Sequence, residues 1–555
     1  MRSLEQPTAD TRPFLRAASS KRTRRAGALA LAAGLAAAQL APARGLAEEP
    51  GPATRRILDI LEFQIEGVSR LSAAELDAVV YPFLGPGRPL EDVEAARAAL
   101  ERAYSDRGYQ SVAVAIPPQT VRGGVVTLVV TEPRVGRLRV RGARWFVPSD
   151  IRRLAPSLAE GTVPNFNDIV RDVTALNQLP DRRVTPALRA GRVPGTVDVD
   201  LNVQDTLPLH GSLEVNDRHG RDTTPLRTGA SLRYDNLWQL GHSVALGAQL
   251  APGRLDDAKI FTGSYTARFA DVPWLSVLAS WAEQGSDIST VGGISVTGRG
   301  RIVGGRFQAT LPGNARFFHV VSAGMDAKSF RERLELGGSA LSSPVTYAPL
   351  TAQYTAAFTA GASQTQLVAS VSANLRGLSS GPERFDAKRY SASANFVVCR
   401  AEATRTDRLP LGLELALRAQ GQYSRDPLLG SEQLGAGGAE SVRGYLESEA
   451  VGDHGGLGSI ELRSPSLDRL FGPLFGRRIV DEWRFHVFAE GAWLAVHHVL
   501  PEQHAEATLS STGGGTQLKL LGRLNGSVEV GFPLRSTAAS GWMEPRFHFR
   551  ASTEF

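Results

Sequence analysis

The sequence predicts two small α+β modules followed by an antiparallel transmembrane β-barrel of sixteen strands. Three observations support this fold class: a secretory signal at the N-terminus, one order of elements that occurs twice after it, and alternation of apolar and polar residues from position 207 onward. No later segment holds the roughly 20 consecutive apolar residues that a transmembrane helix needs. A secreted chain without such a helix is either soluble in the periplasm or crosses the membrane as a closed barrel.

Residues 1–47 are predicted to be a signal peptide. Basic residues at 21–25 precede a short run of Ala, Leu and Gly at 26–40, and small residues suited to cleavage end at Ala43 or Ala47. The alternative is a membrane anchor, for which the run is short and rich in alanine. We also expect no plug helix before the first module, because the few residues between Ala47 and Ile57 cannot thread a barrel and return.

Charge and cysteine content exclude several kinds of partner. The chain holds 62 Lys+Arg and 56 Asp+Glu, and residues 1–47 contain eight of the bases but only two of the acids. The mature chain is therefore near neutral, which gives no support for a nucleic-acid partner. The single cysteine, Cys399, excludes an intrachain disulfide and a cysteine-based zinc site. We expect no metal and no cofactor.

Residues 57–133 and 134–206 are predicted to be two modules with the order strand, helix, helix, strand, strand. In the first, Ser72 introduces one helix and Gly108 can cap the other. Its expected elements are a strand at 57–65, helices at 73–80 and 91–104, and strands near 112–116 and 125–131. The second module is expected to have a strand at 138–140, helices at 148–154 and 165–179, and strands at 185–189 and 196–203.

Residues 207–555 are predicted to form the barrel. Its clearest strand sets Leu413, Leu415 and Leu417 against Glu414, Arg418 and Gln420, as expected of a wall between hydrocarbon and an aqueous lumen. A soluble β-sandwich or solenoid also alternates, but strands of about ten residues suit a tilted membrane strand better. Strands are expected to start near Leu209, Thr228, His242, Ile260, Leu275, Ile302, Phe317, Val345, Thr365, Arg389, Leu411, Leu457, Trp483, Gly515, Asn525 and Pro545.

The last expected strand alternates most regularly of all. Phe547, Phe549, Ala551, Thr553 and Phe555 share one face. A terminal aromatic on such a strand resembles the signal that outer-membrane assembly machinery reads, so Phe555 is the predicted assembly signal.

The tetrapeptide Val442-Arg443-Gly444-Tyr445 lies in a turn-rich stretch at 431–456. Inside a barrel its arginine needs a carboxylate, because an unpaired charge away from bulk water is costly. The peptide Phe488-Ala489-Glu490-Gly491 supplies an acid on a strand. Alternation turns the aromatic residues Trp483, Phe485 and Trp493 toward lipid, so Phe488 and Glu490 point inward. Arg443 paired with Glu490 predicts a gated pore, and the alternative is an exposed turn arginine.

Several short motifs connect these features to a known family. They are Tyr104 with Arg107-Gly108-Tyr109, Pro117-Pro118-Gln119, Gly123 with Glu132, Asn177 with Leu179-Pro180, Pro194-Gly195, Tyr234-Asp235-Asn236-Leu237-Trp238, and, around the tetrapeptide, Pro427-Leu428, Gly437-Gly438 and Gly452-Asp453-His454-Gly455. In order and spacing they resemble the two-partner secretion transporters (TpsB), the haemolysin-activator and filamentous-haemagglutinin exporters. In that family two periplasmic POTRA domains precede a 16-stranded outer-membrane barrel.

The resemblance implies a place in the outer membrane of a Gram-negative bacterium, with the POTRA domains in the periplasm. It implies export of a large, unfolded partner exoprotein, recognised at an N-terminal secretion domain. Arg443 would belong to a loop folded into the barrel and pair with an inward-facing acid. The family usually has Asp in a Phe-x-Asp pattern there, so Glu490 is a departure that could shift a bidentate pair. A monomer that contacts lipid and the barrel-assembly machinery is expected.

Other functions fit parts of the sequence. A barrel-assembly insertase of the same superfamily would share the Arg443 loop, although such factors often carry more than two POTRA domains, and a passive porin needs none. Residues 377–381 fit the hydrolase pattern G-x-S-x-G. They lie between two barrel strands with no following helix pattern, so a hairpin loop is expected. His497-His498 is likewise expected to be a loop rather than a metal site.

Overall fold

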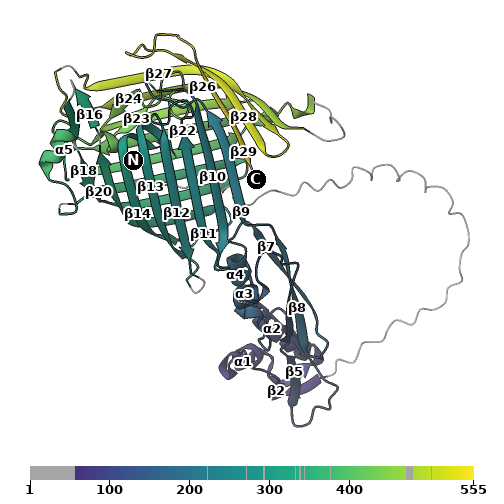
Figure 1. Ribbon diagram of the computed structural model, residues 1–555. Coiled ribbons are helices and arrows are strands. Elements are labelled where there is room, and N and C mark those ends of the chain that lie inside the picture. Colours follow the sequence, from purple (N-terminus) through teal and green to yellow (C-terminus); the bar gives the residue numbers. More distant parts are fainter. Residues whose placement is uncertain are drawn as a thin grey trace, which may run out of the picture.

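The computed structural model describes residues 57–555 apart from 222, 270–271, 292–293, 332, 337–338, 343, 376, 471–478 and 502. The predicted signal peptide and the expected lack of a plug helix lie outside the described residues. Figure 1 shows a large barrel with two small modules attached in series at one end. Within the described ranges no helix is long and apolar enough to cross a membrane.

The first module packs two helices on a three-stranded sheet with the order β2-β5-β4. Alternate residues of β5, Val126, Leu128 and Val130, share a buried core with Leu100 and Tyr104 of α2. Its elements are β1 (Ile57–Ile60), β2 (Glu62–Glu66), α1 (Ala73–Val80), η1 (Tyr81–Phe83), β3 (Gly85–Pro89), α2 (Leu90–Asp106), β4 (Ala113–Ala115) and β5 (Val125–Thr131).

The expected single strand at 57–65 is wrong. The backbone N–H groups of Leu61 and Glu62 both donate to the carbonyl of Gly124, at 2.8 and 3.2 Å, and the chain breaks there. β1 therefore leaves the main sheet and pairs with β3 in a separate two-stranded sheet, while β2 runs parallel to β5.

The second module repeats the arrangement of the first. Its sheet has the order β6-β8-β7, in which the first strand is again parallel to the last and the middle one antiparallel to it. Its elements are β6 (Arg134–Arg141), α3 (Pro148–Arg153), η2 (Pro156–Leu158), α4 (Phe166–Leu176), β7 (Arg182–Ala190) and β8 (Thr196–Asp205).

One polar device occurs in both modules and explains why they turn alike. The chain leaves the first strand through a glycine in the left-handed region, Gly67 (φ +83°) or Gly142 (φ +85°). A carboxylate at the end of the last strand then accepts the following N–H groups. Glu132 accepts from Ser69 and Arg70 at 2.8 and 3.0 Å. Asp205 accepts from the N–H groups of Arg144 and Trp145, both at 2.8 Å.

The two modules meet at a joint between α2 and α4. The N–H of Phe166 donates to the carbonyl of Gly108 at 2.8 Å, and the Asn165 side chain donates to the carbonyl of Arg107 at 2.8 Å. Asn165 also caps α4 by accepting from the N–H of Asn167 at 3.0 Å. A Cβ on Gly108 (φ +91°) would lie 2.6 Å from Asn165 Oδ1, so the close approach requires glycine.

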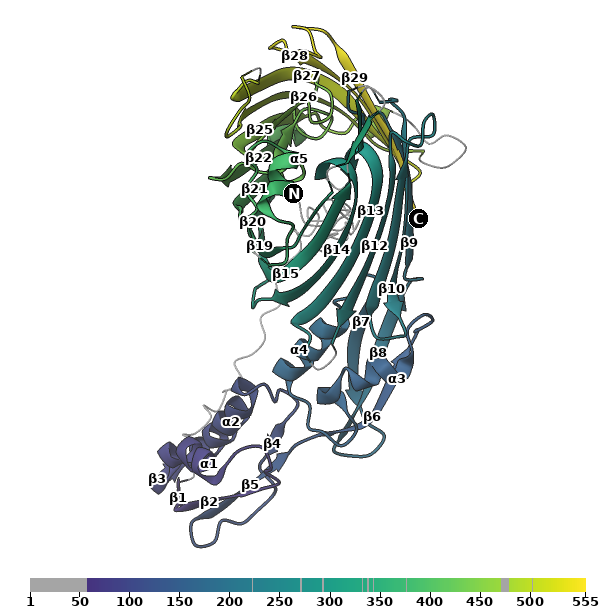
Figure 2. The ribbon, with the colours of Figure 1, turned by 60° about the vertical axis from the view of Figure 1, so that its left-hand side comes forward.

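The barrel closes with sixteen strands, as predicted. β18 and β19 act as one strand, because both pair with β15 and only Ala348 separates them. In Figure 2, β19–β22 face β10–β13 across the interior. The wall strands are β9 (Leu209–Asn216), β10 (Arg227–Leu237), β11 (His242–Leu250), β12 (Lys259–Arg268), β13 (Leu275–Val291), β14 (Ile294–Thr310), β15 (Phe317–Arg331), β18 (Val345–Tyr347), β19 (Pro349–Ala360), β20 (Ser363–Asn374), β21 (Val397–Arg408), β22 (Glu414–Ser424), β25 (His454–Arg463), β26 (Val480–Ala495), β27 (Glu506–Leu520), β28 (Leu524–Pro533) and β29 (Arg546–Glu554).

The remaining elements lie in loops between wall strands. Two are short hairpins and the others are single turns of helix or little more. They are β16 (Arg333–Leu336) with β17 (Ser339–Ser342), α5 (Pro382–Lys388), η3 (Pro410–Gly412), η4 (Gly430–Glu432), β23 (Leu434–Ala436) with β24 (Ala450–Gly452), and η5 (Asp468–Leu470).

Several expected strand starts are displaced. Leu411 lies in η3 and β22 begins at Glu414, while β25 and β26 begin slightly before the expected Leu457 and Trp483. Three starts are displaced further. β14 and β27 begin before the expected Ile302 and Gly515, because glycines interrupt their alternation. The expected start at Arg389 is wrong, since Arg389 ends α5 and β21 begins only at Val397.

The two faces of the wall follow the predicted alternation. On β26, Phe485, Val487 and Trp493 have exposed fractions of 45%, 60% and 43%, whereas Phe488 and Glu490 have 3% and 8%. Exposed apolar side chains on the outside suit a hydrocarbon solvent.

The barrel closes between β29 and β9. Phe555 and Gly211 exchange two backbone hydrogen bonds, each 3.0 Å long. The Phe555 ring covers Gly211, where any Cβ would collide with it. The residue predicted as an assembly signal therefore lies in the closing pair of strands, and its role in assembly stays a prediction.

The second module is fastened to the barrel through the turn between β10 and β11. The Gln239 side chain accepts from the N–H of Val147 at 3.1 Å and donates to the carbonyl of Trp145 at 3.1 Å. Beside this turn, His210 Nε2 of β9 lies 2.9 Å from Asp181 Oδ2 of the second module. The second module is thus attached to the barrel through Gln239 and His210.

Candidate functional site

Residues 425–453, between β22 and β25, fold into the barrel, and we call them the lid loop. Apolar side chains draw the loop inward. Val442 and Tyr445, both fully buried, share a cluster with wall residues Leu494 of β26 and Leu509 of β27. The hairpin of β23 and β24 carries the tip of the loop, residues 437–449, toward the wall.

Arg443, at the tip, is held by Glu490 of β26. Its Nε and one terminal nitrogen lie 2.9 and 2.6 Å from Glu490 Oε1, and its backbone N–H donates to Oε2 at 2.6 Å. The guanidinium also lies over the Phe488 ring, 3.5 Å from its centroid. Glu490 therefore accepts from the side chain and the main chain of one residue, a geometry that its longer side chain permits.

Two further carboxylates complete the Arg443 pocket. Glu461 of β25 and Glu529 of β28 lie 2.9 and 3.1 Å from the guanidinium. These acids have partners of their own, Arg463 for Glu461 at 2.7 Å and His486 for Glu529 at 3.3 Å. One buried cation thus joins three wall strands, and its removal would leave carboxylates facing one another, which costs several kcal/mol.

Glycine makes room for the tip. Gly444 has φ +100°, and a Cβ there would lie 3.1 Å from Pro533 Cδ. On the wall, a Cβ on Gly531 of β28 would lie 2.6 Å from the nitrogen of Gly444. A Cβ on Gly513 of β27 would lie 2.5 Å from the Phe488 ring. Backbone therefore packs on backbone at the tip, which side chains would prevent.

Tyr445 fixes the other side of the tip. Its hydroxyl lies 3.0 Å from the carbonyl of Ser510 on β27 and 2.8 Å from that of Arg535 just after β28. With its ring fully buried, Tyr445 packs against the wall. Gly491 pairs with Gly458 of β25 and places no side chain beside Glu490.

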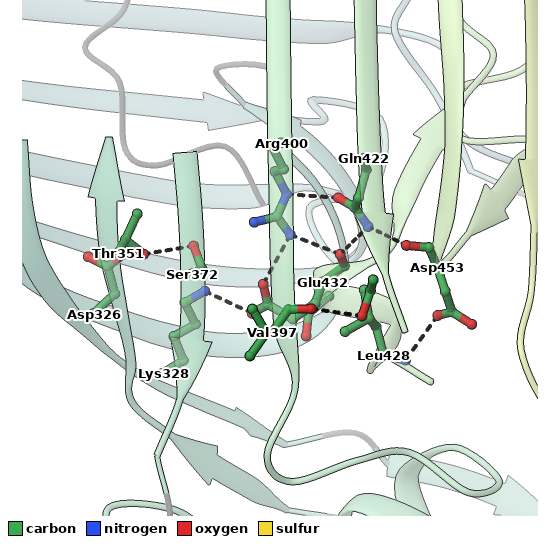
Figure 3. Close-up of polar contacts among 12 residues, drawn as sticks. Asp326, Lys328, Thr351, Ser372, Val397, Arg400, Gln422, Leu428, Glu432 and Asp453 are labelled. Carbon is green, nitrogen blue, oxygen red and sulfur yellow. Dashed lines mark hydrogen bonds and ion pairs between the residues drawn. The ribbon is translucent and has the colours of Figure 1, made fainter. Parts of the chain in front are cut away.

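The base of the lid loop has polar contacts that the sequence did not predict (Figure 3). Asp453 is fully buried and accepts two bonds from the Arg389 guanidinium at 2.6 and 2.7 Å. It also accepts from the N–H groups of Leu428 at 2.9 Å and His497 at 2.7 Å. The motif around Asp453 could have pointed to this role, but the alternation placed Arg389 at the start of a strand, whereas it directly follows α5.

The two competing motifs take structural positions. Ser379 exchanges hydrogen bonds with the Asn374 side chain at 2.9 and 3.2 Å, so its hydroxyl helps to cap the end of β20. The expectation that no helix follows is wrong, since α5 begins at Pro382, one residue after Gly381. His497 lies in a loop, as expected, with Nε2 3.0 Å from the carbonyl of Ser424.

One group of side chains has the spacing of metal ligands among the described residues. The ligand atoms of Asp181, His210 and Asp235 lie within 4.8 Å of one another. Arg233 Nε already lies 2.8 Å from Asp235 Oδ2, and a nearby cation disfavours a metal ion. We therefore interpret this group as an ion-pair network between the second module and the barrel.

Comparison with known proteins agrees with this architecture. Residues 195–473 match the model of the haemolysin secretion/activation proteins ShlB/FhaC/HecB, and residues 58–133 match the ShlB-type POTRA domain. The outer membrane transporter CdiB of Escherichia coli O6:K15:H31 (strain 536 / UPEC) is 26% identical over 499 residues, 87% of this chain and 79% of CdiB. The heme/hemopexin transporter protein HuxB of Haemophilus influenzae (strain ATCC 51907 / DSM 11121 / KW20 / Rd) is 20% identical over 488 residues, 83% of this chain and 80% of HuxB.

Solved structures share the fold. CdiB from Escherichia coli superposes with a TM-score of 0.63 at 20% identity, covering 92% of this chain and 93% of CdiB. BamA from Haemophilus ducreyi lacking POTRA domains 1–3 gives a TM-score of 0.55 at 14% identity, covering 90% of this chain and 100% of that chain. The chain therefore belongs to the haemolysin secretion/activation protein family ShlB/FhaC/HecB, whose members are outer-membrane transporters that export a partner exoprotein by two-partner secretion.

Proposed function

We propose that the lid loop is the gate of this transporter and that Arg443 holds the loop inside the barrel and shapes the pore through which the partner passes. The observation that carries the proposal is the Arg443 pocket, in which one loop cation satisfies carboxylates on β25, β26 and β28. Such a contact is costly to break, yet it involves one loop residue only, so a partner chain that displaces the tip can reverse it.

The POTRA modules receive the partner in the periplasm. An extended segment can add a strand to an unpaired sheet edge. Among the described strands, β2 and β4 of the first module and β6 and β7 of the second each pair on one side only. The captured chain then passes unfolded through the polar lumen, and folding at the cell surface draws it outward.

The partner is a large secreted exoprotein, haemolysin-like or adhesin-like, with an N-terminal secretion domain. The transporter works as a monomer in lipid and reaches the membrane through the barrel-assembly machinery, which reads the strand ending at Phe555. Assembly of other barrels is the second candidate function. The likeness to BamA supports only the shared fold, whereas the family model that matches half of the chain favours export.

Secretion of the partner tests the gate. Arg443→Ala should abolish secretion while the barrel keeps its heat-modifiable migration on gels, because the wall strands are untouched. Arg405→Ala is a matched control, since Arg405 pairs with Asp407 on the same strand, β21, away from the lid loop. Normal secretion by Arg443→Ala would contradict the gate.

Removal of the first module tests capture. A chain that lacks residues 57–133 should lose export but keep the conductance of its channel in planar bilayers, because the deletion leaves the wall intact. Unimpaired export would contradict the capture role. Failure of other outer-membrane proteins to assemble, with secretion unchanged, would favour the insertase.

A further inference from the structure

A second buried charge cluster holds the lid loop at its base, away from the Arg443 pocket (Figure 3). Glu432 of η4 is 1% exposed and Lys328 of β15 is 2% exposed. Lys328 Nζ lies 2.8 Å from Glu432 Oε1, and the Tyr347 hydroxyl of β18 donates to the same oxygen at 2.7 Å. A wall lysine is thus neutralised by a loop carboxylate.

Arg400 of β21 extends the cluster to the main chain of the loop. Its guanidinium donates to the carbonyl of Glu432 at 3.0 Å and lies 3.4 Å from Glu432 Oε2. It also donates to Gln422 of β22 at 2.8 Å, and Gln422 in turn donates to the carbonyls of Glu432 and Asp453 at 3.0 and 3.2 Å. Both ends of the lid loop are therefore tied to the same patch of wall.

The base and the tip of the lid loop contact different wall strands, and the charge that the wall offers has opposite sign at the two sites. At the base, the wall offers cations, Lys328 and Arg400, to a loop acid. At the tip, the wall offers the acids of β25, β26 and β28 to a loop cation. Neither site can substitute for the other, because a loop that shifted along the wall would bring like charges together.

Loss of Glu432 would leave the base without its acid. The nearest other carboxylate on β15, Asp326, is already engaged by Arg306 at 2.6 Å. Lys328 and Arg400 would then face each other across a buried site without the anion that both contact. Release of the base would instead expose them to water in the lumen, where the charges are solvated.

We propose that Glu432 is a second residue that anchors the lid loop to the barrel wall, through its contacts with Lys328, Tyr347 and Arg400. The lid loop is held at its base by Glu432 and at its tip by Arg443, and the closed pore requires both contacts. This role rests on the proposed function of the lid loop as the gate.

Single-channel recordings of the full-length protein in planar bilayers test the role of Glu432. Glu432→Gln should raise the ratio of open to closed time roughly tenfold or more, because loss of a buried charge partner exceeds the free energy that corresponds to a factor of ten. Lys328→Met should have a similar effect. The effect of the double variant should be smaller than the sum of the two single effects, because removing Lys328 together with the carboxylate leaves only Arg400 without its anion.

Asp407→Asn is the matched control, since it makes the same change of carboxylate to amide at a pair within β21, and it should leave the ratio unchanged. The proposal would be overturned if Glu432→Gln kept the wild-type ratio of open to closed time, or if the two single effects were additive in the double variant. Arg443→Ala separates the two hypotheses. If it opens the channel while Glu432→Gln and Lys328→Met do not, only the role proposed for Glu432 is contradicted. If none of the three opens it, the gate itself fails.

Discussion

The first module and the barrel of this protein differ in where they place charge, because the module has an apolar core and the barrel has a charged interior. In the first module the buried residues are a continuous apolar cluster around Leu100 and Leu128. In the barrel, the largest apolar side chains of β26 face outward, and the interior buries Arg443, Glu490, Lys328 and Glu432. The difference follows from the solvent, which is water around the modules and hydrocarbon around the barrel. Substitutions with the same chemistry should therefore have different consequences in the two regions.

The largest effect is expected when a buried acid in the barrel is neutralised. Glu490→Gln should destabilise the docked tip by about 4 kcal/mol, because Gln cannot satisfy the charge and the main-chain N–H of Arg443 together. Proteolysis from the cell surface should then cut the tip of the lid loop, while the wall stays resistant. A tip that stays protected would mean that Glu461 and Glu529 suffice.

The second test truncates the apolar core of a module. Leu100→Ala should cost roughly 3 kcal/mol by leaving a cavity between α2 and β5. Hydrogen exchange in the first module should accelerate, whereas exchange in the wall strands should not change. A matched change on the lipid face, Val487→Ala, should cost much less, since hydrocarbon fills the space. Equal costs at the two sites would contradict the contrast of solvents.

A smaller effect is expected at the polar device of the first module. Burial alone would raise the pKa of Glu132, but hydrogen bonds from Ser69, Tyr104 and Arg70 outweigh it and hold the pKa below its usual value. The folded module therefore gains stability from the ionised carboxylate above the pKa of unfolded Glu, and this stability is lost as the pH falls through the folded pKa. Glu132→Gln should cost about 1.5 kcal/mol at neutral pH.

Hydrogen exchange of α2 measured as a function of pH checks this prediction. The wild-type module should lose protection on acidification through the carboxylate range, and the Glu132→Gln module should be less sensitive. A variant with the same pH dependence as the wild type would show that another acid is responsible.

The smallest effect is expected at a surface pair. Asp407→Asn breaks an ion pair with the exposed Arg405 and should leave the thermal stability of the barrel unchanged within error, because exposed pairs contribute little. A measurable loss, followed by the temperature of heat modification, would show that even rim charges matter to this barrel.

Alternation predicted the barrel and half of the Arg443 pocket. It fixes which face each side chain takes, so it placed Phe488 and Glu490 inside. It does not fix the register of one strand relative to its neighbours, and for that reason Glu461 and Glu529 could not be assigned to Arg443 from the sequence. Lys328 and Glu432 are 104 positions apart in the chain and meet only once the barrel has closed.

The errors in the modules and strands have a similar origin. The break between β1 and β2 depends on the carbonyl of Gly124, which belongs to a turn far along the chain. The alternation predicts a strand start at Gly515, yet Gly513, Gly514 and Gly515 lie inside β27, where a Cβ would meet the Phe488 ring or the carbonyls of neighbouring strands. Local patterns cannot register a contact whose partner is remote in sequence.

The contacts at Gly108 and Asn165 join the first module to the second, and the Gln239 contacts join the second module to the barrel. Each connection uses main-chain groups, so neither offers a free swivel. A polypeptide gripped by the first module would be presented below the pore at a set distance and bearing. If the first module captures the partner as proposed, these contacts set the position of the cargo relative to the pore, and lengthening the chain at Gly108 should impair export without changing binding.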